Sequence, residues 1–161
     1  MVTVGILTCS DAGSRGQRQD TSGQTIREMV EAKGFTVARS EIVPDERAVI
    51  ADRIRRWAAE VDLVLTTGGT GMGQRDVTPE ATGDVMEREA PGLAEAMRFV
   101  TAQKTPMAWL SRATAGVRGR CLIINLPGSP KAVRECLEVV MPLIPHALET
   151  LHGPTNVHPT N

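Results

Sequence analysis

Short continuous apolar runs alternate along this chain with segments that carry helix start and stop signals. The runs are rich in β-branched residues, predict buried strands, and occupy 2–9, 35–43, 61–67 and 121–126. The intervening segments predict helices at 22–33, 46–60, from 78 onward, at 92–103 and from 130 onward. This alternation predicts an α/β domain with a mostly parallel sheet and helices on both faces.

Local capping signals predict where several helices begin. Thr21 and Gln24 have the spacing of a capping box, and Thr78 and Ser129 each stand before a proline, as an N-cap residue often does. In the helix at 46–60, Ile50, Ile54 and Trp57 fall on one face, which predicts that this face packs on the sheet. Gly34 ends the first helix, and the prolines at 142 and 145 split the last one.

Three stretches lack a clear pattern. Residues 10–20 predict a polar loop, 104–119 give no regular element, and the Pro-rich residues 154–161 predict an irregular tail. We therefore expect one domain over 1–153. Parallel sheets bind ligands beyond the carboxyl ends of their strands, so the loops that follow the strands are the first place to look for function.

Composition and charge exclude several classes of protein. The 161 residues carry 18 Lys and Arg against 19 Asp and Glu, a net charge of −1 that argues against a nucleic-acid coat protein. Two Phe, two Trp and no Tyr are too few for a base-stacking surface. The apolar runs are too short to span a bilayer, no signal peptide is visible, and Cys9, Cys121 and Cys136 form no disulfide framework. We expect a cytoplasmic globular domain that binds neither nucleic acid nor membrane.

The strongest local signal for ligand binding is the glycine-rich loop at 68–77. Glycines at 68, 69, 71 and 73 leave backbone N–H groups unshielded, and a helix start follows, which together suit a phosphate. The loop is no Walker A motif, because Gln74 stands where that motif has Lys, and its spacing is not that of a dinucleotide fingerprint. The alternative is a tight turn that only connects strand and helix.

Two aspartates near this loop have a structural and a functional interpretation. If phosphates bind beside Asp76, a cation has to lie between the negative charges, which makes Asp76 a candidate Mg²⁺ ligand. The alternative, which the local pattern supports equally, is an acid that interacts with the dipole of the helix that follows. Asp45 follows the second strand, and local pattern favours a plain N-cap for it.

Other strand-end loops add polar groups. Ser10 and Asp11, with Ser22 and Gly23, either orient a polar ligand or form a surface loop with a cap. The segment 125–131 combines a strand end, a turn, a capped helix start and Lys131, whose charge opposes the helix dipole unless an anion is bound. Arg112, Arg118 and Arg120 match phosphate geometry, but excess arginine is general in this chain. The chain shows no Ser-His-Asp or Cys-His arrangement.

Taken in order and spacing, these segments resemble the molybdenum cofactor biosynthesis family of MogA, MoaB and the gephyrin G domain. The resemblance runs from residue 4 to about residue 153. The matching pieces are 10–11, 20 with 22–23, 42–46, 65–71, 75–81, 88–92, 110–112, 116–119 and 122–129.

The resemblance implies a fold and an activity. The fold is a single three-layer α/β/α domain, usually a homotrimer and sometimes a hexamer. The activity is the adenylylation of molybdopterin with Mg-ATP, which releases pyrophosphate and supplies a downstream molybdenum-insertion protein. The two acids of the active pattern fall on Asp45 and Asp76, predicted here as catalytic and metal-binding, whereas enterobacterial MoaB lacks acids at these places. The chain lacks the extended C-terminal region of MogA, and 21–23 resembles MoaB and gephyrin more. The competing class is a non-catalytic carrier or oligomeric scaffold.

The remaining site residues are predicted to bind nucleotide and pterin, with Ser111, Arg112 and Lys131 at the anionic end of the pterin. The nucleophile, a phosphate, is ionised at neutral pH and needs no general base. The predicted binding residues are Ser10, Asp11, Ser22, Gly23, Gly68, Gly69, Thr70, Gly71, Ser111, Arg112, Asn125, Pro127, Gly128, Ser129 and Lys131.

Overall fold

Six strands form one mixed sheet in the order β2-β1-β3-β6-β5-β4 in the computed structural model, which describes residues 1–153. The expected irregular tail at 154–161 lies outside the described residues. The first four strands of that order are parallel, and β5 and β4 add an antiparallel edge. The strands are β1 (Thr3–Cys9), β2 (Thr36–Val43), β3 (Leu63–Thr67), β4 (Arg88–Glu89), β5 (Ala115–Arg118) and β6 (Cys121–Leu126).

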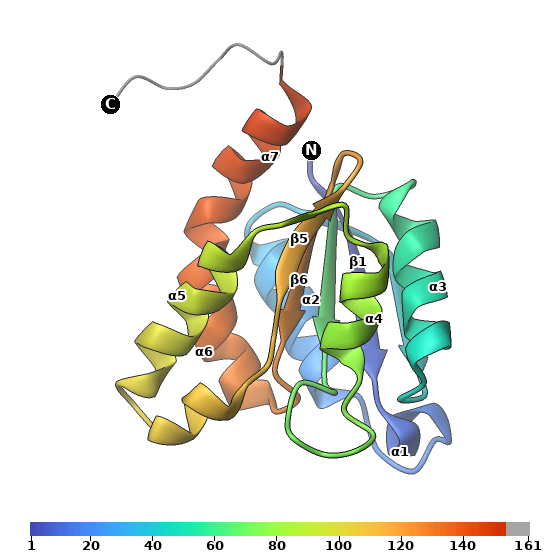
Figure 1. Cartoon of the computed structure of the whole chain (residues 1–161). Coiled ribbons are helices and arrows are strands. Elements are labelled where there is room, and N and C mark those ends of the chain that lie inside the picture. The colour runs from blue at the N-terminus through green and yellow to red at the C-terminus, as the bar shows by residue number, and fades with distance from the viewer. Residues whose placement is uncertain (154–161) are drawn as a thin grey trace.

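Helices cover both faces of the sheet (Figure 1), which confirms the predicted α/β/α architecture. Helices α2, α5, α6 and α7 pack on one face, and α3 and α4 pack on the other. The helical elements are α1 (Asp11–Ser14), α2 (Thr21–Ala32), α3 (Arg47–Ala58), α4 (Thr78–Val85), α5 (Pro91–Ala102), η1 (Pro106–Leu110), α6 (Pro130–Val140), η2 (Met141–Leu143) and α7 (Ile144–His152).

The two cores follow from the alternation of side chains along each strand. Leu65 and Ile124 point to the face with α2 and α6, while their neighbours Val64 and Ile123 point to the face with α3 and α4. All four are fully buried, and each such side chain contributes about 1.5–3 kcal/mol on burial. This is why these strands read as continuous apolar runs. The three cysteines are buried as expected, and burial raises the pKa of the Cys9 thiol to about 12.

Some predicted helix starts are wrong by one residue, and two segments contain short elements that were not predicted. The N-cap of α2 is Asp20, whose carboxylate accepts a hydrogen bond from the Gly23 N–H at 2.9 Å, so the expected capping box at Thr21 does not form. The N-cap of α4 is Val77, which places Thr78 inside the helix. The predicted loop at 10–20 contains the single turn α1, and 104–119 contains η1 and β5.

Other local signals are confirmed. Ser129 caps α6 by accepting a hydrogen bond from the Ala132 N–H at 3.2 Å. The last helical region is divided into α6, η2 and α7, with Pro142 and Pro145 in the first turns of the latter two.

The sheet order creates a crevice at the carboxyl end of β1 and β3. The chain leaves β1 toward α2 on one face and leaves β3 toward α4 on the other, so the two loops separate above the strand ends. Such a switch point is where open α/β sheets bind ligands.

The opposite end of the sheet joins the first strand to the last helix through one carboxylate. Asp62 accepts hydrogen bonds from the Thr3 N–H at 2.9 Å and the Thr3 hydroxyl at 3.1 Å. On its other side, Asp62 Oδ1 lies 3.8 Å from Nε2 of His152, the last residue of α7. Figure 1 shows the start of β1 and the end of α7 at the same end of the molecule, away from α1.

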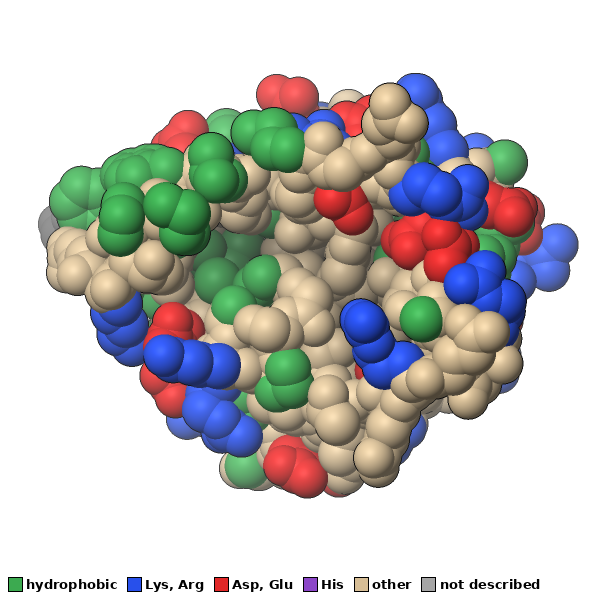
Figure 2. Space-filling view, turned by 90° about the horizontal axis from the view of Figure 1, so that it is seen from below, with side chains coloured by type: hydrophobic (Ala, Val, Ile, Leu, Met, Phe, Trp, Pro, Cys, Tyr) green, Lys and Arg blue, Asp and Glu red, His purple; other side chains and the backbone are tan. Residues whose placement is uncertain are grey.

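An apolar patch lies exposed on α5 and η1. It consists of Phe99, Val100, Met107, Trp109 and Leu110, which are 39–64% exposed. In Figure 2, hydrophobic side chains gather at the left of the view, over these elements. Within residues 1–153, no helix is both long and apolar enough to cross a membrane.

Candidate functional site

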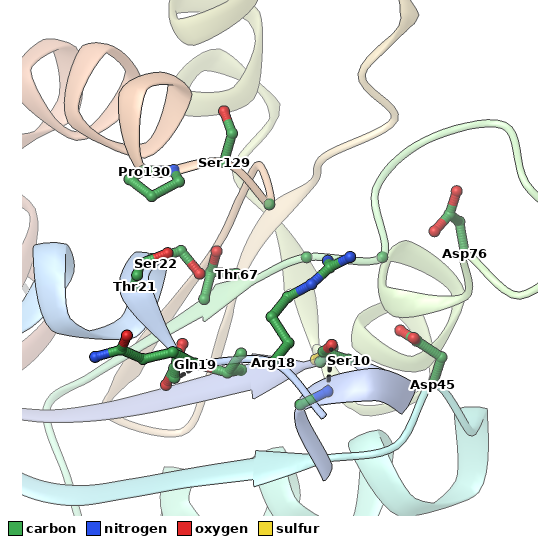
Figure 3. Close-up of a pocket in the computed structure, with 17 residues that line it drawn as sticks. Ser10, Arg18, Gln19, Thr21, Ser22, Asp45, Thr67, Asp76, Ser129 and Pro130 are labelled. Atoms are coloured by element: carbon green, nitrogen blue, oxygen red, sulfur yellow. Dashed lines mark hydrogen bonds between the residues drawn. The ribbon is translucent and has the colours of Figure 1, made fainter. Parts of the chain in front are cut away.

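A polar cavity of about 490 Å³ opens at the switch point (Figure 3). Its walls come from the loops that follow β1, β2, β3 and β6, so segments distant in sequence meet there. This is the arrangement expected from the strand-end loops. The predicted site residues that line it are Ser10, Ser22, Asp45, Gly68, Gly69, Asp76, Gly128 and Ser129.

A second, mainly apolar cavity of about 310 Å³ has the next residues of the glycine-rich loop in its wall. It adjoins the exposed patch, because Met107 and Leu110 also line it. The predicted residues Asp11, Gly23, Arg112, Asn125 and Lys131 line neither cavity. Those that line the second cavity are Thr70, Gly71, Ser111 and Pro127.

The glycine-rich loop needs glycine at its first two positions. Gly68 and Gly69 have φ of +93° and +69°, which side chains rarely adopt. A Cβ at Gly68 would strike the Cys9 carbonyl oxygen, and one at Gly69 would strike the Thr78 hydroxyl and lie 3.2 Å from Asp45 Oδ1. Within residues 1–153, the backbone N–H groups of 69–72 donate to no protein acceptor. A run of unpaired N–H groups is an anion-binding feature, which a plain connecting turn does not require.

Asp45 is held by Asp11 and not by the helix that follows it. The Asp11 N–H donates to Asp45 Oδ2 and the Asp45 N–H donates to Asp11 Oδ1, each at 3.0 Å. The N-cap of α3 is Glu46, so the capping interpretation of Asp45 is wrong. Asp45 Oδ1 is buried and has no hydrogen-bond partner within residues 1–153. Burial raises the pKa of this carboxyl, and the charges of Asp11 and Asp76 raise it further.

Asp76 closes the other end of the glycine-rich loop. Its Oδ2 accepts a hydrogen bond from the Gly73 N–H at 2.9 Å, a contact inside the loop that caps no helix. Figure 3 places Asp45 and Asp76 on the same side of the cavity, from the loops after β2 and β3. Two carboxylates at one wall repel each other, so the arrangement favours a cation between or beside them.

Arg75 fastens the glycine-rich loop to α1. Its guanidinium donates to both carboxylate oxygens of Asp11, at 2.7 and 2.9 Å. This pairing lowers the pKa of the Asp11 carboxyl to about 2. Asp11 thus positions Asp45 and accepts hydrogen bonds from Arg75, and its predicted contact with the ligand stays a prediction.

Arg112 holds the same loop from the opposite side. It donates from Nε to the Gly71 carbonyl at 2.8 Å and from Nη2 to the Asp76 carbonyl at 2.6 Å. It also pairs with both oxygens of Glu80, at 2.7 and 3.2 Å, which lowers the pKa of the Glu80 carboxyl. Four of the five N–H donors of the guanidinium are thus engaged within the protein. These contacts make Arg112 a clamp on the loop, and its predicted contact with the pterin stays a prediction.

Asn125 lies inside the protein, although its place at a strand end suggested a ligand contact. Its side chain is fully buried and donates to the hydroxyls of Thr66 and Thr82, at 3.0 and 2.9 Å. Its Oδ1 accepts a hydrogen bond from the Thr114 N–H at 3.1 Å. Lys131, in the first turn of α6, is exposed and makes no ion pair within residues 1–153.

Sequence reasoning missed several residues of the polar cavity. Arg18 and Gln19 line it from the loop before α2, Thr21 and Pro130 line it as the first residues of α2 and α6, and Thr67 lines it from the end of β3. Thr67 and Pro130 could have been predicted, because they stand directly at the end of a predicted strand and at the start of a predicted helix. Arg18 lies in a loop with no periodicity, so nothing local marked it.

Removing the Asp45 charge is expected to stabilise the protein. Below pH 3.8, the ordinary pKa of an aspartate, the Asp45 carboxyl is neutral in both the folded and the unfolded protein. Because its pKa is raised in the folded protein, the free energy of unfolding falls as the pH rises from 3.8 through that raised pKa. In EDTA at pH 7, Asp45→Asn should raise the thermal midpoint above that of the native chain, because the amide carries no charge to desolvate. Calorimetry at pH 7 and pH 3 checks this, since the difference should vanish at the lower pH. An equal gain at both pH values would contradict it.

Comparisons with known proteins agree with this architecture. A family model described as "Probable molybdopterin binding domain" matches residues 5–146. The chain is 44% identical over 156 residues to a molybdopterin adenylyltransferase of Helicobacter pylori, covering 94% of this chain and 89% of that protein. It is also 44% identical over 163 residues to gephyrin of Dictyostelium discoideum, covering 93% of this chain and 22% of that protein.

A solved structure is similar throughout. The crystal structure of the molybdopterin biosynthesis enzyme MoaB from Thermus thermophilus is 57% identical, has a TM-score of 0.90, and covers 96% of this chain and 98% of that one. The family match spans most of the chain, and the resemblance drawn from the motifs is confirmed. The chain belongs to the molybdopterin-binding family that contains MogA, MoaB and the gephyrin domain.

Proposed function

We propose that this chain is a molybdopterin adenylyltransferase, which transfers AMP from ATP to the terminal phosphate of molybdopterin and releases pyrophosphate. Relatives that match nearly the whole chain carry this activity in their name. The observation that carries the proposal is the placement of Asp45 and Asp76 at one polar cavity, which Gly68 and Gly69 of the glycine-rich loop also line. A carrier that only binds anions gains nothing from two acids there, which favours the enzyme over the carrier or scaffold.

The acids fit a magnesium ion as part of this proposal. Within residues 1–153, Asp45 Oδ1 is buried without a partner, and burial, followed by the nearby charges of Asp11 and Asp76, raises the pKa of the Asp45 carboxyl. Residues 1–153 hold no cluster of three or more metal-ligating side chains, which suits Mg²⁺, an ion bound by one or two carboxylates together with water and substrate phosphates. We propose that Asp45 and Asp76 hold it. When bound, the ion supplies positive charge to the ATP phosphates and the leaving pyrophosphate.

The remaining cavity residues orient the substrates. The Gly69 N–H has no acceptor within residues 1–153 and is free to donate to a phosphate oxygen, and the glycines at 68 and 69 let a phosphate approach the backbone closely. Thr70 and Gly71, whose N–H groups also lack an acceptor in that range, line the neighbouring apolar cavity. The N-terminus of α6, capped by Ser129, adds a partial positive charge at the same cavity. No group has to remove a proton, because the attacking phosphate is already ionised at pH 7.

The test is pyrophosphate release from ATP, with and without molybdopterin, in Mg²⁺ and in EDTA. Release that requires both molybdopterin and Mg²⁺ is the expected result. Saturable molybdopterin binding without release would move the chain to the carrier class. Release with EDTA present would contradict the metal role and leave the transferase.

The exposed patch on α5 and η1 supports a homotrimer, or a hexamer, as part of the proposal. Five large apolar side chains on one surface are more than a monomer usually leaves to water. Sedimentation of the native chain beside Trp109→Ser measures the assembly, and loss of mass in the variant is expected. We also propose that a downstream molybdenum-insertion protein uses the product, and that the chain works in the cytoplasm.

A further inference from the structure

The polar cavity has an unusual charge balance for a site that must accept ATP. Three carboxylates line it, those of Asp20, Asp45 and Asp76. Among the described residues that line it, Arg18 is the single Lys or Arg. Figure 3 shows its side chain reaching across the cavity from the loop before α2, toward the strand ends that carry the glycine-rich loop.

The other arginines near the site are already engaged. Arg75 gives a bidentate pair to Asp11, and Arg112 gives one to Glu80 with two further bonds to loop carbonyls. The Arg18 side chain makes no hydrogen bond or ion pair within residues 1–153, so its guanidinium keeps all five N–H donors for a ligand.

The backbone on both sides of Arg18 is anchored. The Gln17 N–H donates to the Ala12 carbonyl at 2.9 Å, and the Thr21 N–H donates to the Gln19 carbonyl at 3.0 Å. Asp20 then caps α2 and also accepts a hydrogen bond from the Thr8 hydroxyl at 2.9 Å. Arg18 therefore projects from a short stretch of chain whose two ends are tied to α1 and to the start of α2.

We infer that Arg18 is a catalytic residue that contacts the ATP phosphates during transfer; this rests on the proposed function. In the transfer, an ionised phosphate oxygen of molybdopterin forms a bond to the α-phosphorus of ATP. The bond from that phosphorus to the oxygen bridging to the β-phosphate breaks, and its electron pair leaves with pyrophosphate. Negative charge grows on the bridging oxygen, and the fork of a guanidinium stabilises charge spread over neighbouring phosphate oxygens.

Arg15 provides a matched control for this role. It lies three positions away, its side chain donates only to Gln17 Oε1, at 3.3 Å, within residues 1–153, and it lines neither cavity. Arg18→Ala and Arg15→Ala remove the same charge, so a general electrostatic effect lowers both rates equally. We expect Arg18→Ala to lower kcat by ~30-fold and Arg15→Ala to change it by less than ~2-fold.

Conservative replacement and rescue separate chemistry from folding. Arg18→Lys keeps the charge but loses the fork, so it should remain ~5-fold or more below the native rate. Added guanidinium ion should restore part of the Arg18→Ala rate and none of any Arg15→Ala loss. Equal kcat for the two alanine variants, or no rescue, would overturn the inference.

Calorimetric titration with Mg-ATP distinguishes this inference from the proposed function. If the native chain releases no pyrophosphate, the proposed function fails. Arg18 is then judged by affinity for Mg-ATP, which should be at least ~10-fold weaker in Arg18→Ala than in Arg15→Ala. Equal or absent binding in both variants would overturn the role of Arg18.

Discussion

Asp76→Asn should lower the rate of pyrophosphate release at least ~100-fold, the effect of losing ~3 kcal/mol of charge stabilisation. The amide keeps the shape of the carboxylate, and its oxygen can still accept the hydrogen bond from the Gly73 N–H. The loop should therefore keep its conformation while it loses the charge that holds a cation. Turnover measured with saturating Mg-ATP and molybdopterin, beside a urea titration, checks both halves of this expectation.

Asp84→Asn is a matched control for the charge change. Asp84 lies on α4 and pairs with Arg47 at 2.7 and 2.8 Å, outside both cavities. Its replacement should leave turnover within ~2-fold, because exposed pairs contribute little to the fold and nothing to this site. Native turnover in Asp76→Asn would remove the metal role of that residue. A collapse of stability instead would show that the carboxylate serves the loop.

Asn125→Leu should destabilise the protein by about 3–5 kcal/mol, a large part of the stability of a domain. The apolar side chain has a similar size, but the Thr114 N–H and the Thr66 hydroxyl lose their partner. Each buried polar group left without a partner costs about 1–3 kcal/mol. Urea unfolding with an unchanged slope measures the loss.

Ser129→Ala is a reference variant with which the stability loss in Asn125→Leu can be compared. Ser129 caps α6 just beyond the same strand but is exposed, so its removal should cost about 1 kcal/mol. A cost below that for Asn125→Leu would mean that the threonine hydroxyls and the Thr114 N–H find water or other partners.

Local signals in the sequence were sufficient for the elements that carry the fold. The strand at Cys121–Leu126 is apolar at nearly every position, because helices cover both faces of the sheet. Ser129 before a proline marked the start of α6 to the residue. Such signals depend only on neighbours in the chain, so they can be recognised without knowledge of the tertiary structure.

The features that the sequence did not predict depend on contacts between segments that are distant in the chain. Strands β4 and β5 are two and four residues long and exist because they pair with each other and with β6. Arg112 and Asn125 look like ligand contacts in the sequence, but their partners lie up to 41 and 59 residues away, inside the protein. Arg18 was missed for the converse reason, since only the fold brings its loop to the cavity.

The meeting of Thr3 and His152 at Asp62 has a consequence for how this domain can be combined with others. Both ends of the described fold lie at the amino ends of the strands, at the end of the molecule opposite α1 (Figure 1). A second domain attached at either end of the described fold would join it at the end of the sheet opposite the polar cavity. The same proximity makes the fold a good subject for circular permutation, in which a short linker joins the old ends and new ones open in a surface loop.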